Sequence, residues 1–123
     1  MTPYLNPASA IKFCRAVDVN APSARTFADG IATREPDADA VATLCRGAAR
    51  MTLVDEDAIA EAMRIYFDDT HQVAEGAGAA PLAALLQERD KMRNKTVAVV
   101  LSGGNIERSR FLQVLGGVTP PVP

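Results

Sequence analysis

The chain has 123 residues, of which 48% are hydrophobic and 23% are charged, and its formal net charge is −2. This balance is typical of an ordinary globular domain and excludes a disordered or collagen-like chain. Because no cluster of lysine and arginine exceeds two residues, we expect neither nucleic acid nor a membrane surface as a partner.

The first part of the chain has an irregular pattern, with four prolines in residues 1–36 and one short predicted helix at 8–17. It lacks the apolar core of a signal peptide, and no later apolar run approaches the ~20 residues of a membrane span. We therefore expect a cytoplasmic protein. Cys14 and Cys45 lie far apart without metal-binding or redox spacing, which favours two buried free thiols.

The pattern becomes regular from Asp37, which is predicted to cap a helix whose apolar spacing stops near Gly47. Residues 50–54 are predicted to form a short strand. The acidic cluster at 55–57 then begins an amphipathic helix that reaches about Thr70. Three acids could also bind a metal, but acids at a helix start are more often a solvated cap, so we predict no metal site.

A third helix is predicted over residues 78–93, with an apolar stripe of leucines and small alanines beside it, and Asn94 ends it. Residues 96–101 are continuously apolar, which is typical of a strand buried on both faces of a parallel sheet. A last helix is predicted over 106–115. The expected fold class is α/β, a partial open parallel sheet with flanking helices.

A glycine-containing motif, Ser102-Gly103-Gly104-Asn105, directly follows the apolar run. In an open parallel sheet, ligands bind beyond the carboxyl ends of the strands, so this motif is the first candidate site. Its glycines let the backbone approach a ligand, and amides at the next helix start could meet a phosphate, a carboxylate or a ring nitrogen. Taken alone, the motif is equally compatible with a tight turn whose asparagine caps the helix.

Three motifs taken together resemble the C-terminal part of threonine dehydratases and serine racemases, which are pyridoxal-phosphate (PLP) enzymes of the tryptophan-synthase-β fold group. In chain order they are residues 28–30, 70–79 and 99–105. Residues 50–59 also resemble that family, so the resemblance covers roughly 26–107. It implies the C-terminal portion of the large domain of a fold-type II PLP enzyme.

The resemblance further implies an ammonia-lyase that converts a hydroxy-amino acid to a 2-oxo acid and ammonia, with PLP carrying the chemistry. It implies a contact of the Ser102 hydroxyl with the pyridine nitrogen and a role for Glu75 near the cofactor's face. The other implied cofactor-binding residues are Gly103, Gly104 and Asn105 beside Ser102, and Gly30 in the loop bordering the pocket. Glu75 could instead be a helix-start acid, and the Asp29-Gly30 pair a simple turn. His71, the only histidine, is expected to be a helix-end or packing residue rather than a catalytic base.

The family's Schiff-base lysine follows a serine and a phenylalanine, and no such triplet occurs here, since Lys12 precedes Phe13. The glycine run that holds the cofactor phosphate is also missing. Residues 2–9 contain no acid that could serve the cation site of some relatives, so we predict no metal. We predict no catalytic residue in this chain, no covalently bound PLP, and no activity of the chain by itself.

Two hypotheses about function therefore remain. In the first, the chain is the C-terminal part of an enzyme and its partner is an N-terminal polypeptide. In the second, it is a non-catalytic remnant that associates with itself, as a homo-oligomer, or with a full-length relative. A nucleotide-phosphate site is a weaker third idea because the Walker lysine is absent. The expected domains are an irregular segment at 1–25, an α/β part at 26–117 and a Pro-rich tail at 118–123.

Overall fold

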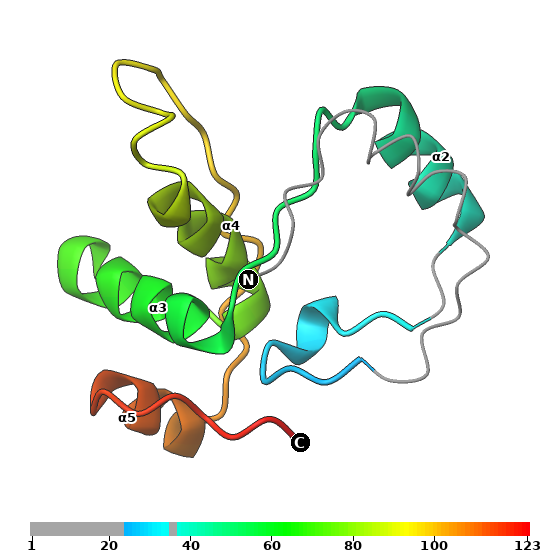
Figure 1. Cartoon of the computed structure of the whole chain (residues 1–123). Helices are drawn as coiled ribbons and strands as arrows, with labels where there is room; N and C mark the ends of the chain where they lie inside the picture. Colours follow the sequence, from blue (N-terminus) through cyan, green and yellow to red (C-terminus); the bar gives the residue numbers. More distant parts are fainter. Residues whose placement is uncertain (1–23, 35–36) are drawn as a thin grey trace. The chain divides into compact units, whose positions relative to one another are not determined.

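The computed structural model describes residues 24–34 and 37–123 (Figure 1). The described elements are a short 3-10 helix and four α-helices: η1 (Asp29–Ile31), α2 (Ala38–Gly47), α3 (Glu56–Thr70), α4 (Gly76–Gln87) and α5 (Arg108–Leu115). The chain divides into two compact units, of which one contains α2 and the other consists of residues 25–32 and 54–123. We call the latter the helical unit. The predicted short helix at 8–17 lies outside the described residues.

α2 begins and ends where the sequence predicts. The side chain of its N-cap, Asp37, accepts a hydrogen bond of 2.8 Å from the Ala40 amide, and the helix ends at Gly47. The expectation of a buried free thiol is wrong for Cys45, which is exposed and disulfide-bonded. Since α2 buries none of its residues, a side chain on this helix remains at the surface. Cys14 lies outside the described residues.

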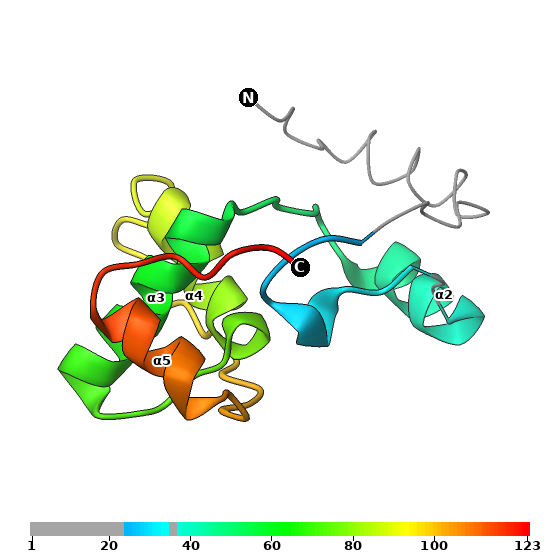
Figure 2. The same ribbon diagram turned by 90° about the horizontal axis from the view of Figure 1, so that it is seen from below.

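α3 also confirms its prediction. The Asp55 side chain caps it by accepting a hydrogen bond of 2.7 Å from the Ala58 amide. At the other end His71 adopts a left-handed conformation with φ of 55°, and its amide donates to the carbonyls of Phe67 and Tyr66. His71 is therefore a helix-end residue. Figure 2 shows α3, α4 and α5 gathered together in the helical unit.

The two acids in the first turn of α3 do more than a solvated cap would. Glu56 accepts hydrogen bonds from the Thr26 hydroxyl at 3.1 Å and the Phe27 amide at 3.2 Å. The Thr119 hydroxyl donates to the carboxylate of Asp57. These acids therefore fasten the segment before η1 and the chain's C-terminal segment to the start of α3.

α4 differs from its prediction at both ends, because it spans Gly76–Gln87 rather than 78–93, and Pro81 lies inside it. Proline has no amide hydrogen, so the helix continues past Pro81 without one backbone hydrogen bond. After Gln87 the chain becomes mostly charged, and a longer helix would bury little apolar surface. Successive turns follow, up to Asn94 with its positive φ of 63°.

The core of the helical unit is built mainly from small side chains. Fully or almost fully buried residues are Phe27, Ala28, Ile59, Ala60, Ala62, Met63, Ala74, Ala79, Ala83 and Val114. The many alanines allow α3 and α4 to approach closely. α5 begins two residues later than predicted and packs through an edge-to-face contact of Phe111 with Phe67, whose ring centroids lie 5.6 Å apart. Among the described helices, none is long and apolar enough to cross a bilayer.

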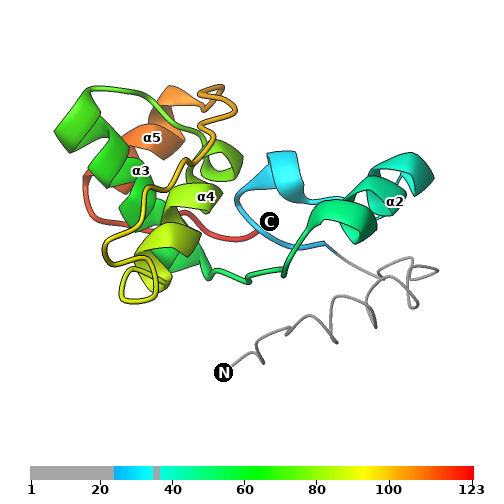
Figure 3. The same cartoon turned by 90° about the horizontal axis from the view of Figure 1, so that it is seen from above.

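Neither predicted strand forms, and the described residues contain no β-strand. Figure 3 shows the yellow-to-orange chain between α4 and α5 as an irregular path without an arrow. The reason is that a strand is defined by hydrogen bonds to a neighbouring strand. Residues 96–101 make no backbone hydrogen bond with any described residue, so their apolar pattern has no sheet to join. The expected partial parallel sheet is therefore not observed in the described part of this chain.

Candidate functional site

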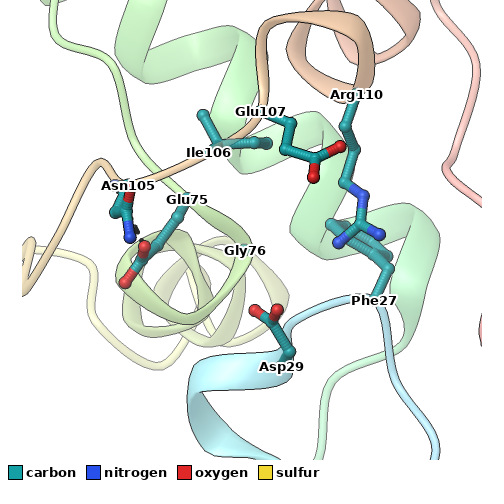
Figure 4. Close-up of a pocket in the computed structure, with 8 residues that line it drawn as sticks. All are labelled: Phe27, Asp29, Glu75, Gly76, Asn105, Ile106, Glu107 and Arg110. Carbon is teal, nitrogen blue, oxygen red and sulfur yellow. Dashed lines mark hydrogen bonds between the residues drawn. The ribbon is translucent and has the colours of Figure 1, made fainter.

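The segment 102–105, which we call the glycine segment, lies against the start of α4. The Glu75 amide donates a hydrogen bond of 3.1 Å to the Gly103 carbonyl. The Glu75 side chain in turn accepts a bond of 3.0 Å at Oε2 from the Asn105 amide (Figure 4). Glu75 thus holds the glycine segment at two points, once through its backbone and once through its carboxylate.

Asn105 does not cap the following helix, because the N-cap of α5 is Glu107. Nor does any turn or bend occur between residues 95 and 107, although the Ile106 amide donates to the Gly104 carbonyl at 3.0 Å. The alternative of a simple helix-capping turn is therefore wrong for this segment. Its conformation is fixed by contacts with residues about thirty positions earlier in the chain.

The glycines here are required by the close approach of neighbouring atoms. A Cβ on Gly103 would lie 2.5 Å from Oε1 of Glu75. A Cβ on Gly78, in the first turn of α4, would overlap the Gly103 carbonyl oxygen, and one on Gly104 would overlap the Val73 carbonyl oxygen. At Gly78 and Gly104 the obstructing atoms belong to the backbone and cannot rotate away, so a side chain there would push the glycine segment out of place, whereas at Gly103 it would displace the Glu75 carboxylate.

The loop of η1 also lies beside the Glu75 carboxylate. A Cβ on Gly30 would lie 2.9 Å from the Cβ of Ala77 and 3.7 Å from Oε1 of Glu75. The Glu75 carboxylate is therefore next to both Gly30 and Gly103, and it joins the three sequence motifs. Residues from three separate stretches of the chain meet around one side chain.

Ser102 stands at the edge of this arrangement. Its side chain is exposed, it does not line the cavity described below, and its hydroxyl makes no hydrogen bond with the described residues. The hydroxyl is therefore available to a ligand. The structure thus brings together Gly30, Glu75, Gly103, Gly104 and Asn105, with Ser102 adjoining them.

A cavity of about 110 Å³ opens beside Glu75 and Asn105. It is lined by Phe27, Asp29, Glu75, Gly76, Asn105, Ile106, Glu107 and Arg110. In Figure 4 the side chains of Asp29, Glu107 and Arg110 extend toward a shared space over the ring of Phe27, which is 2% exposed. Three carboxylates and one guanidinium give this cavity a net negative charge, which favours a cationic or dipolar group over a simple anion.

Sequence reasoning did not assign Glu107 or Arg110 to the site. The available signal was their spacing, since side chains three residues apart at the start of a helix share one face. Of the lysines, the structure describes Lys91 and Lys95. Both lie in the charged segment after α4, where Lys91 pairs with Glu88 at 3.6 Å. Lys12 lies outside the described residues.

Comparisons with known proteins identify a family, two curated relatives and a solved structure that are similar to this chain. The family described as pyridoxal-phosphate dependent enzyme matches residues 4–103. The chain is 40% identical over 82 residues to an L-threonine ammonia-lyase of Thermotoga maritima, covering 67% of this chain and 20% of that protein. It is 42% identical over 90 residues to an L-threonine ammonia-lyase of Geobacter sulfurreducens, covering 72% of this chain and 22% of that protein.

A solved crystal structure, that of a threonine deaminase from T.th., superposes on this chain with a TM-score of 0.69 at 33% sequence identity. The match covers 82% of this chain and 38% of the threonine deaminase chain. The chain spans about a fifth of the length of the curated relatives it matches.

Proposed function

Because the chain belongs to the pyridoxal-phosphate dependent enzyme family, we propose that it is the C-terminal part of a threonine ammonia-lyase. The complete enzyme would convert threonine to 2-oxobutanoate and ammonia. The observation that supports this function best is that Gly30 and the glycine segment both lie next to the carboxylate of Glu75. In the complete enzyme the chain would add flanking helices and an extended run to an open parallel sheet.

The residues around the glycine segment fit one edge of PLP. The Ser102 hydroxyl is exposed and unbonded among the described residues, and the adjoining peptides of Gly103 and Gly104 carry no side chain. A ring nitrogen could therefore approach this hydroxyl. When bound, PLP supplies the electron-withdrawing ring that allows an amino acid to lose its α-proton and its β-hydroxyl group.

The chain's own residues would position this ring edge. Ser102 would form a hydrogen bond with the pyridine nitrogen, and a neutral hydroxyl does not favour protonation of that nitrogen as a carboxylate would. Glu75 would hold the peptide of Asn105, so that Ser102 keeps its place. Gly30 would let the loop of η1 border the pocket without a side chain in the way. In this proposal none of the three exchanges a proton with substrate.

The chain by itself would not be active, and an N-terminal polypeptide would be its partner. This proposal is supported by the sequence, because none of its lysines follows a Ser-Phe pair and no glycine run could hold the cofactor phosphate. Covalent attachment of PLP and most of its phosphate contacts would then come from the partner. The contribution of this chain would be the ring-nitrogen edge of the site.

The test is turnover in a complemented enzyme. The full chain is co-expressed with the part of the Thermotoga maritima relative that precedes the matched stretch, and release of 2-oxobutanoate from threonine is measured. Ser102→Ala should lower the rate roughly ten- to a hundredfold, because one hydrogen bond to a polarised group contributes about 1.5–3 kcal/mol. Ser109→Ala, at an exposed serine of α5, is the matched control and should leave the rate unchanged.

If Ser102→Ala turned over threonine as fast as the unchanged chain, the cofactor-side role of Ser102 would be wrong. If the complemented pair bound PLP but released no 2-oxo acid from threonine or serine, the ammonia-lyase function itself would be wrong.

A further inference from the structure

We infer that the cavity beside Glu75 binds a free α-amino acid, without a covalent bond, through the ammonium and carboxylate groups that every such molecule carries. The cavity is lined by residues in or next to η1, α4 and α5, all within the helical unit. Ser102, to which the proposed function assigns the PLP ring, does not line it. The inference therefore adds a second ligand to the helical unit, and its binding does not depend on PLP.

Arg110 supplies the positive charge of the cavity and has no partner for that charge within the described chain. The described residues include two half-buried arginines, Arg64 and Arg110. Arg64 donates hydrogen bonds to the Glu61 carboxylate and to the Val114 carbonyl. Arg110 forms neither a hydrogen bond nor an ion pair with a described residue. A guanidinium that has lost part of its water without gaining a protein acceptor is best satisfied by an anionic group of a ligand.

The carboxylates around the same space complement an ammonium group. The side chains of Asp29 and Glu107 accept no hydrogen bond from a described residue, and both extend toward the shared space in Figure 4. Glu75 uses Oε2 for the Asn105 amide, which leaves Oε1 without a hydrogen bond from the described residues. An ammonium group has three hydrogens to donate, so it can bond to more than one of these oxygens.

A dipolar ligand satisfies both signs of charge at once. A simple anion would pair with Arg110 but would be repelled by the three carboxylates, and a simple amine would leave the guanidinium without a partner. The described residues also contain no group of three or more His, Cys, Asp or Glu side chains that could hold a metal ion. An α-amino acid carries its ammonium and its carboxylate on one carbon, so both groups can enter the same small space.

The size of the cavity agrees with the charged end of an amino acid. A protein cavity of roughly 150 Å³ holds a benzene molecule. The cavity beside Glu75 has a volume of about 110 Å³. It therefore has room for a slightly smaller group of roughly five non-hydrogen atoms, which is the size of the ammonium, the α-carbon and the carboxylate together. The ring of Phe27, which is 2% exposed, forms an apolar floor beneath them.

A ligand in this cavity would also act on the glycine segment. Glu75 and Asn105 both line the cavity, and the Asn105 amide donates to Oε2 of Glu75 at 3.0 Å. An ammonium bonded to Oε1 would hold the same carboxylate in place, so the Asn105 bond would open mainly after the ligand had left. An effect on the PLP edge would rest on the proposed function, whereas binding itself would not.

The experiment is a titration of the full chain, without PLP, followed by residue-resolved NMR of its amides. L-Alanine is the probe, and ethylamine and propanoate are its counterparts without the carboxylate and without the ammonium. L-Alanine should cause saturable shifts at Gly76, Asn105 and Glu107. It should bind about tenfold or more tightly than either counterpart, because each of them lacks one charge-assisted contact. At a concentration of about ten times its dissociation constant, it should slow exchange of the Asn105 amide roughly tenfold.

Three variants test the two sides of the cavity. Arg110→Gln removes the partner of the ligand carboxylate and should weaken L-alanine binding about tenfold or more. Arg108→Gln is the matched control, since Arg108 is an exposed arginine of the same helix that does not line the cavity, and it should leave the affinity unchanged. Asp29→Asn, at an exposed residue, should weaken binding on the ammonium side. Unchanged α3 amides show that a variant still folds.

Several outcomes would overturn the inference. These are the absence of a saturable shift with L-alanine, equally tight binding of ethylamine or propanoate, and an unchanged affinity of a folded Arg110→Gln chain. Equal weakening by Arg108→Gln would also overturn it, because the effect would then be one of overall charge. Since the titration contains no PLP and measures no turnover, each of these outcomes leaves the proposed function intact. Binding of L-alanine without turnover in the complemented enzyme would uphold the inference and refute the proposed function.

Discussion

Among single residues, Glu75 contacts the glycine segment through both its backbone and its side chain. Its Oε2 accepts the Asn105 amide, and its own amide binds the Gly103 carbonyl. Glu75→Ala removes the side-chain acceptor and should lower the free energy of unfolding by about 0.5–1.5 kcal/mol, the usual net contribution of a hydrogen bond whose donor can turn to water. Glu75→Gln keeps an acceptor oxygen of nearly the same shape and should lose less. Urea denaturation measures both values.

Hydrogen exchange at the Asn105 amide is the specific readout for this pair of variants. Exchange should accelerate in Glu75→Ala and change little in Glu75→Gln. Equal acceleration in both variants would mean that the negative charge, rather than an acceptor oxygen, holds the glycine segment.

Tyr66 offers a prediction of opposite sign. Its hydroxyl is buried without a hydrogen-bond partner among the described residues, and burial raises the pKa of Tyr66. Tyr66→Phe should therefore raise the free energy of unfolding by about 1–2 kcal/mol, since it removes an unsatisfied polar group. Urea denaturation near neutral pH checks the sign, and a lower stability of the variant would show that the hydroxyl has a partner.

The same residue predicts a pH dependence. A phenol whose pKa is higher in the folded than in the unfolded chain favours folding fully below the unfolded value, near 10.0. This contribution is lost as pH rises through the raised folded pKa, because the unfolded chain releases its proton first. As pH rises from about 10.0 to the raised folded pKa, the free energy of unfolding of the unchanged chain should therefore fall more steeply than that of Tyr66→Phe.

Among the elements, the contact of α4 with the glycine segment depends on a residue without a side chain. A Cβ on Gly78 would overlap the Gly103 carbonyl oxygen, which is backbone and cannot rotate away. Gly78→Ala should lower the free energy of unfolding by about 1–3 kcal/mol, as overpacking does. Gly47→Ala is the control, because nothing lies within 4 Å of its added Cβ and alanine favours a helix. Melting midpoints are measured for both variants. If Gly78→Ala and Gly47→Ala lowered the midpoint equally, the steric argument would be contradicted.

For the whole molecule, the prediction concerns the chain without a partner. A ligand stabilises a protein only to the extent that it binds the folded state, and this chain would supply a single edge of the PLP site. Incubation with PLP should leave the melting midpoint unchanged. Borohydride reduction should leave no PLP on any one lysine, and threonine should yield no 2-oxobutanoate. A specific lysine adduct with turnover would contradict the proposal that the chain is inactive alone.

The elements that the sequence predicts correctly are those that local interactions determine. Asp37 and Asp55 cap α2 and α3 through amides three residues away, and the apolar spacing that follows needs only helical geometry. The predicted strand at 96–101 required a partner from elsewhere, and the described chain provides none. Its apolar pattern could therefore predict burial in a sheet without producing a strand in this chain.

The candidate site, like the fold, was predictable from the sequence only in part. The sequence by itself determined the motifs, and through them the membership of the family and the residues Gly30, Glu75 and Asn105. Only the tertiary structure decided that the Glu75 carboxylate joins them, and that Asp29 and Arg110 line a cavity beside it. These contacts link residues 30 or more positions apart. Such contacts depend on how α3, α4 and α5 pack together, and the spacing within any one segment does not encode that packing.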